Sequence, residues 1–174
     1  YFGNRATNAH QYGGYIVPDG INYQNASVSA GAKESHSGTH AVRLFNNTTQ
    51  LGFIGSYMVL PAIDCDRMDT LQINFWARPF SENANGNVTI NTNMASIRPL
   101  KVGLVSDPND ISTFEPIAEF IYSNSAITTS TKVVPSDPVN KLFEQYSFGI
   151  NDTEGKYIAF LNDTLGYWCI DDIT

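Results

Sequence analysis

The feature that most constrains this fold is a series of short apolar or alternating segments, each bounded by Asn, Asp, Gly or Pro. No window of helical length places apolar residues at the i, i+3, i+4 and i+7 positions of an amphipathic helix. The segment 71–77 instead alternates, and Leu71, Ile73, Phe75 and Ala77 are predicted to lie on one face of a strand. Further strands are predicted at residues 41–45, 53–60, 100–105, 117–122, 128–134, 143–150, 157–161 and 167–173. This regular spacing predicts an all-β fold, an antiparallel β-sandwich with jelly-roll topology.

The domain organisation predicted from the 174 residues is simple. An Asn- and Gly-rich segment at 81–92 is predicted to be a loop, and no charge run, internal repeat or low-complexity tract divides the chain. We therefore expect residues 1–174 to form a single β-sandwich domain. We also expect this domain to be part of a larger secreted polypeptide, whose other domains would be its partners.

The charge of the chain disfavours two classes of partner. Ten Lys and Arg residues against 17 Asp and Glu residues give a net charge of -7, which repels nucleic acid and anionic membrane surfaces. The longest apolar stretch, 51–61, is far shorter than a membrane span, so no membrane insertion is expected. Charged residues make up only 16% of the chain, and Asn, Ser, Thr and Tyr replace them. This composition is typical of extracellular all-β modules.

The two cysteines, Cys65 and Cys169, are far apart in the sequence and have no metal-binding spacing. A disulfide between them requires neighbouring strands, with Cα atoms about 4.4–6.8 Å apart. Two separate thiols satisfy the sequence equally well, so both alternatives stay open.

Several motifs occur in the order found in a family of secreted jelly-roll modules, and together they extend over nearly the whole chain. They are PDGI at 18–21, SGTHAVRL at 37–44, PAID at 61–64, LQINFWAR at 71–78, VGLVSD at 102–107, TFEPI at 113–117, KYIAF at 156–160 and YWCIDDI at 167–173. The chain thus resembles MAM-like domains, the cleaved-adhesin domains of bacterial haemagglutinins and carbohydrate-binding-module-like domains. The resemblance implies a cell-surface or secreted location and a role in adhesion, glycan binding or domain spacing.

The same resemblance implies a possible structural calcium ion. In the family, the first Asp of the closing motif binds calcium together with carbonyl oxygens of an early loop. This role would fall to Asp171, with partners in the turn at 31–38, where Glu34 has the only side-chain carboxylate. In the alternative, Asp171 accepts hydrogen bonds from N–H groups of a crossing loop. The carboxylates of Asp171 and its neighbour Asp172 point to opposite faces of a strand unless a bulge intervenes.

Aromatic residues are the candidate ligand-binding groups. Tyr12, Tyr15 and Tyr23 lie in a polar N-terminal stretch and are predicted to be exposed, and Trp168 in the closing strand is a further candidate. Aromatic rings of this kind can stack on sugars while Asn and Asp bind the hydroxyl groups. The predicted function is a non-catalytic extracellular binding or adhesion module. Its expected ligand is a carbohydrate, or else a host or matrix protein. A spacer domain without its own ligand is the alternative.

Two patterns suggest catalysis or zinc binding but are not expected to provide either. Asp64, Asp66 and Asp69 resemble the carboxylate strand of β-sandwich glycanases, although their surroundings are typical of a polar turn. His36 and His40 have a spacing that brings two imidazoles to one zinc ion on a helix, but here a turn and a strand are predicted. The chain is therefore not predicted to be an enzyme.

Overall fold

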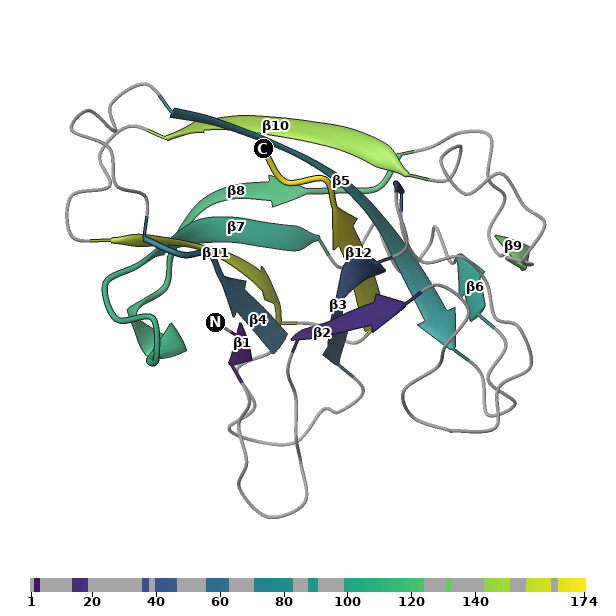
Figure 1. Cartoon of the computed structure of the whole chain (residues 1–174), viewed down its shortest axis with the longest axis horizontal. Helices are drawn as coiled ribbons and strands as arrows, with labels where there is room; N and C mark the ends of the chain where they lie inside the picture. Colours follow the sequence, from purple (N-terminus) through teal and green to yellow (C-terminus); the bar gives the residue numbers. More distant parts are fainter. Residues whose placement is uncertain are drawn as a thin grey trace, which may run out of the picture.

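The computed structural model describes residues 2–3, 14–18, 36–37, 40–46, 56–62, 71–82, 88–90, 99–123, 131–132, 143–150, 156–163 and 166–174 (Figure 1). The strands are β1 (Phe2–Gly3), β2 (Gly14–Pro18), β3 (His40–Asn46), β4 (Ser56–Val59), β5 (Leu71–Glu82), β6 (Val88–Ile90), β7 (Leu100–Val105), β8 (Glu115–Phe120), β9 (Thr131–Lys132), β10 (Glu144–Ile150), β11 (Tyr157–Asn162) and β12 (Gly166–Asp171). One 3₁₀ turn, η1 (Ile111–Thr113), is the helical element within these ranges. Over this part of the chain, no helix has the length and apolar character needed to cross a membrane.

The strands form two sheets. One sheet has the order β1-β4-β11-β7-β8, and the other has the order β2-β3-β12-β5-β6-β9, with β10 also paired to β5. Every described pairing is antiparallel. The predicted all-β antiparallel sandwich is confirmed, while its jelly-roll topology stays a prediction.

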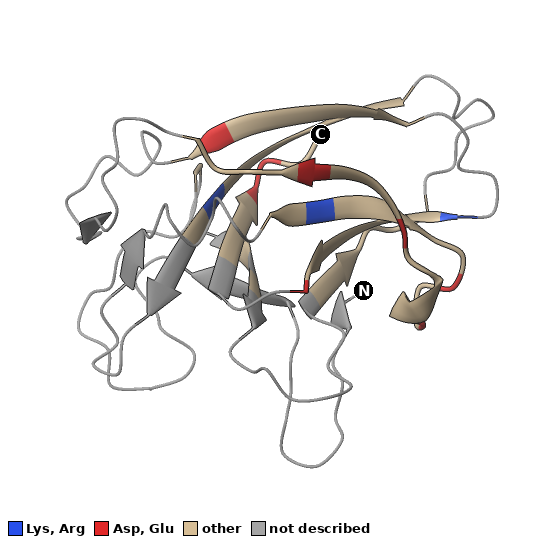
Figure 2. Ribbon diagram, turned by 180° about the vertical axis from the view of Figure 1, so that it is seen from behind, with Lys and Arg blue, Asp and Glu red and all other residues tan. Residues whose placement is uncertain are grey.

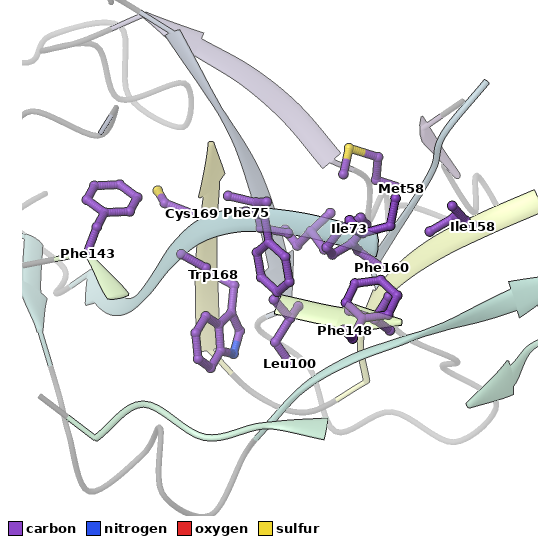
Figure 3. Packing of buried hydrophobic residues seen from close by; sticks show 14 of the residues in the cluster. Met58, Ile73, Phe75, Leu100, Phe143, Phe148, Ile158, Phe160, Trp168 and Cys169 are labelled. Atoms are coloured by element: carbon purple, nitrogen blue, oxygen red, sulfur yellow. The ribbon is translucent and has the colours of Figure 1, made fainter. Parts of the chain in front are cut away.

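The main core lies between the two sheets and is rich in aromatic residues. Ile73, Phe75 and Ala77 of β5 are buried in it, as the alternating pattern predicted. The ring of Phe75 contacts a group of rings from both sheets, which are those of Phe120, Tyr146, Phe148 and Phe160. Figure 3 shows several of these rings together with the indole of Trp168. Burial of this apolar surface is the main favourable contribution to folding.

The strand β5 is longer than the sequence pattern indicated. It continues beyond Ala77 to Glu82, and β6 occupies part of the segment 81–92 that was predicted to be a loop. The loop prediction was wrong for residues 81–82 and 88–90, where β5 and β6 pair with each other, while the rest of the segment lies outside the described residues. Pro79 lies opposite Trp168 of β12, and β6 pairs with both β5 and β9.

A β-bulge interrupts the pairing of β7 with β8. Val102 lies opposite Ala118 and Gly103 lies opposite Pro116, so Ile117 is the extra residue on β8. The backbone of β8 approaches Gly103 so closely that an added Cβ atom would lie 2.1 Å from the carbonyl oxygen of Glu115. This close approach requires glycine at position 103.

A second, smaller apolar cluster covers the outer face of the five-stranded sheet. Val59, Val105, Ala159 and Leu161 pack there against Ile111 of the turn η1. The segment that follows β7 therefore returns over the sheet instead of extending into solvent.

Candidate functional site

The closing segment contains the bulge that the sequence left open. Asp171 lies opposite Trp76 of β5, and Thr174 then exchanges two backbone hydrogen bonds with Asn74. The closing segment thus advances three residues where β5 advances two. The extra residue is Asp172, whose φ of 48° lies in the left-handed region that Asp adopts more readily than most residues. Because of this bulge, both carboxylates reach the same neighbouring segment.

Asp171 binds the backbone of that segment. Its Oδ2 atom accepts hydrogen bonds from the N–H groups of His36, at 2.7 Å, and Ser37, at 3.1 Å. Its Oδ1 atom accepts a third, at 2.8 Å, from the N–H of Asp172. These contacts are those of the crossing-loop alternative, in which Asp171 accepts hydrogen bonds from backbone N–H groups, while its role as a calcium ligand stays a prediction.

Asp172 binds the side chains of the same two residues. The His36 Nδ1 atom lies 2.6 Å from Asp172 Oδ2, and the ring donates because an ionised carboxylate only accepts. The hydroxyl of Ser37 donates to Oδ1 at 2.5 Å. The imidazole also stacks on Trp76, with ring centroids 4.0 Å apart and planes 9° apart. We call these five residues, His36, Ser37, Trp76, Asp171 and Asp172, the His36 clamp.

The His36 clamp has the residue types of a hydrolytic triad but not its connectivity. In a triad the Ser hydroxyl is bonded to the imidazole, which removes its proton. In the clamp, the hydroxyl of Ser37 and the ring of His36 both donate to Asp172 instead. This arrangement holds a loop segment against the outer face of the seven-stranded sheet.

The described groups around Asp171 are hydrogen-bond donors. Calcium prefers six to eight oxygen ligands, whereas both oxygens of this carboxylate accept N–H groups. The described ranges hold no group of three or more His, Cys, Asp or Glu residues suited to a metal ion. Glu34 lies outside the described residues. Calcium binding therefore stays a prediction that depends on groups beyond those described.

The structure corrects the placement of Trp168 among the ligand-binding residues. Its exposed fraction is 2%, and its indole lies in the core between the sheets, so it offers no ring face to a sugar at the surface. Tyr12 and Tyr23 lie outside the described residues. The backbone of Tyr15 lies in β2 opposite Arg43 of β3, but its side chain is not among those that the structure describes. Their predicted role stays a prediction.

The other sequence candidates have similarly mixed outcomes. Residues 64–69, which include the three carboxylates of the glycanase alternative and Cys65, lie outside the described part of the chain. Cys169 is fully buried in β12, and its pairing with Cys65 stays open. His40 is the first residue of β3, the strand that was predicted to begin at residue 41.

Sequence reasoning missed two contacts on the outer face of the seven-stranded sheet. Trp76 was placed correctly on the face opposite Phe75, but its stacking on His36 was not foreseen. Arg78 is fully buried, and its guanidinium lies 5.2 Å from the ring centroid of Phe143. Such a cation–π contact offsets part of the cost of burying the charge. The sequence signal for both contacts was the same: a Trp and an Arg alternate with core residues in β5.

The clamp should make the stability of the protein sensitive to acid. Hydrogen bonds from His36 and Ser37 lower the pKa of Asp172 below its ordinary value near 3.8. A carboxyl group whose pKa is lower in the folded state stabilises the fold above that ordinary value, and this contribution is lost as the pH falls through the folded-state pKa. We expect a loss of about 1 kcal/mol, since the carboxylate is partly exposed.

Urea unfolding between pH 5 and pH 2 measures this dependence. In the Asp172→Asn variant, the free energy of unfolding should change less with pH over this range. An identical slope in both proteins would show that Asp172 is not stabilised by the clamp.

Comparisons with known proteins bear on the fold. The sequence matches no protein-family model, and a search of curated proteins finds no similar sequence. Among solved structures, the K2 cleaved adhesin domain of Lys-gingipain is similar, with 12% identity and a TM-score of 0.50. That match covers 99% of this chain and 95% of the other. The K3 cleaved adhesin domain of Lys-gingipain from Porphyromonas gingivalis has 20% identity and a TM-score of 0.49, covering 92% and 88% of the two chains. The chain thus has a fold similar to that of the K2 adhesin domain along nearly its full length.

Proposed function

We propose that this chain is a non-catalytic, extracellular binding module of the adhesion type. The observation that carries the proposal is the β-sandwich, whose similarity to the K2 cleaved adhesin domain extends over 99% of the chain. The chemistry of the His36 clamp supports the non-catalytic part, because the Ser37 hydroxyl and the His36 ring both donate to the carboxylate of Asp172, so the hydroxyl is not bonded to the imidazole. A cell-surface or secreted location belongs to the same proposal.

The described surface favours a protein as the ligand. All aromatic side chains whose burial is described are at least partly buried, so none forms an exposed platform for a sugar. The exposed large apolar residues of this part are instead aliphatic, Ile117 and Ile121. Exposed apolar side chains that lie near one another can contribute to a protein contact. A carbohydrate ligand remains part of the proposal through Tyr12, Tyr15 and Tyr23.

A binding survey with the purified protein tests this function. We expect saturable binding to at least one member of a panel of immobilised serum and extracellular-matrix proteins. On a glycan array we expect at most weak binding, and after incubation with polysaccharides no reducing sugar should be released. The heat-unfolded protein is the control for nonspecific adsorption.

Each outcome of the survey separates the proposal from its alternatives. Release of reducing sugar would overturn the non-catalytic assignment. Strong binding to a glycan would support carbohydrate recognition in place of a protein ligand. Absence of binding to every protein and glycan would favour a spacer domain.

A further inference from the structure

Beyond the bulge, from Ile117 on, exposed residues recur at every second position of β8 and at the position after it. Glu115, Ile117, Glu119 and Ile121 are all exposed, and the two isoleucines have exposed fractions of 41% and 52%. We call these four residues the β8 strip. The two isoleucines are the exposed large apolar residues of the described surface, and both lie on this one segment of the chain.

The charge presented by the β8 strip is negative, although each Glu has a Lys partner. The Lys156 Nζ atom lies 2.6 Å from Glu115, and the exposed fraction of the side chain is 28% for the Lys and 67% for the Glu. Lys101 lies 3.8 Å from Glu119, with 26% and 56% exposed, respectively. Lys101 is also bound at 2.7 Å to Asp163. Because the carboxylates are the outer members of both pairs, an approaching partner meets negative charge first.

Within the part of the chain that the structure describes, β8 lies at the edge of its sheet. Among the described strands, β8 is the last of its sheet and pairs only with β7 (Figure 2). An edge strand can bind an extended segment through its backbone as well as its side chains. Pro116 and the bulge at Ile117 disfavour regular backbone pairing at the start of β8. Recognition there must therefore depend on side chains.

Building on the proposed adhesion function, we propose that the β8 strip binds an extended, basic segment of a partner protein. In that segment, a Lys or Arg residue lies between two aliphatic residues, as Glu119 lies between Ile117 and Ile121 in the strip. Side chains on one face of an extended segment recur every second residue, so a basic side chain can meet Glu119 while aliphatic ones meet Ile117 and Ile121. The net charge of -7 favours the approach of such a segment.

Nuclear magnetic resonance titration of the ¹⁵N-labelled protein with short peptides tests the proposal. The probe is an end-blocked octapeptide that alternates lysine with valine. Its controls alternate glutamate with valine, or lysine with serine. We expect saturable shift changes centred on residues 115–121 with the lysine–valine peptide. Equal binding of the lysine–serine peptide would overturn the apolar part of the proposal, and changes centred elsewhere, or none, would overturn the site.

Matched variants separate local recognition from overall charge. Glu115→Gln with Glu119→Gln removes two negative charges from the strip, and we expect binding at least about tenfold weaker. Ser106→Lys with Gln145→Lys changes the net charge equally at exposed positions elsewhere and should weaken binding much less. Equal weakening in both variants would show that only the net charge matters.

A variant of the apolar residues completes the test. Ile117→Thr with Ile121→Thr keeps β-branched side chains and should weaken peptide binding by a similar factor without lowering the melting temperature. Unchanged affinity would overturn the aliphatic contacts. If the variants keep the binding to serum or matrix proteins found in the survey, the β8 strip is not its site although the adhesion function stands. If the wild type binds the peptide but none of the serum or matrix proteins, the adhesion function is overturned while the peptide site stands.

Discussion

Replacement of Trp168 by alanine is expected to lower the free energy of unfolding by about 3–5 kcal/mol, the largest loss among the changes considered. The indole is one of the largest fully buried side chains, and its removal leaves a cavity between the two sheets. For a domain of this size, the melting temperature should fall by about 10 °C. Thermal and urea unfolding followed by circular dichroism measure both quantities.

A matched surface truncation shows whether this loss comes from burial. Ile121→Ala removes an aliphatic side chain whose exposed fraction is 52%, and the free energy of unfolding should change by no more than about 0.5 kcal/mol. A Trp168→Ala protein with the melting temperature of the wild type would place the indole at the surface. Trp168 would then be available as a ligand-binding residue after all.

Replacement of Gly103 by alanine should have the second-largest effect, a loss of about 3 kcal/mol. The added methyl carbon would lie 2.1 Å from the carbonyl oxygen of Glu115 and 2.8 Å from the ring of Phe114. A carbonyl oxygen in a paired strand cannot move aside without breaking the contact between β7 and β8. Urea unfolding gives the free energy, and amide hydrogen exchange shows whether protection is lost first along these two strands.

The chain offers a matched control for this substitution. Gly149 in β10 is exposed, and a Cβ atom added there meets nothing within 4 Å. Gly149→Ala should therefore be neutral or stabilise the protein by up to about 1 kcal/mol, because alanine restricts the unfolded chain. Equal destabilisation by the two substitutions would contradict the close approach of β8 to Gly103.

Local sequence pattern was enough to predict most of the strands and the faces of β5. Phe75 and Trp76 were assigned to opposite faces because side chains alternate along any strand. The end of β5 was not predictable in this way. Its extension to Glu82 depends on β12 and β6, and β12 lies about ninety residues further along the chain.

The candidate site was predictable only in outline. The resemblance to known modules implied a calcium ion shared by Asp171 and the turn at 31–38, whereas the contacts present are the direct hydrogen bonds of the alternative. The nature of the contact depends on the bulge at Asp172, which has no distinctive sequence signal. The stacking of His36 on Trp76 was equally hidden, since it joins two segments that are adjacent only after folding.

The central position of β12 has a consequence for the timing of folding. Because β12 lies between β3 and β5, the seven-stranded sheet cannot be completed before residues 166–171 have left the ribosome. Until then, the edges of β3 and β5 that will receive it lack their partner. Pairings over such long separations also form slowly. We therefore expect a nascent chain that stops before residue 166 to lack the completed seven-stranded sheet, even when every other strand of that sheet has been synthesised.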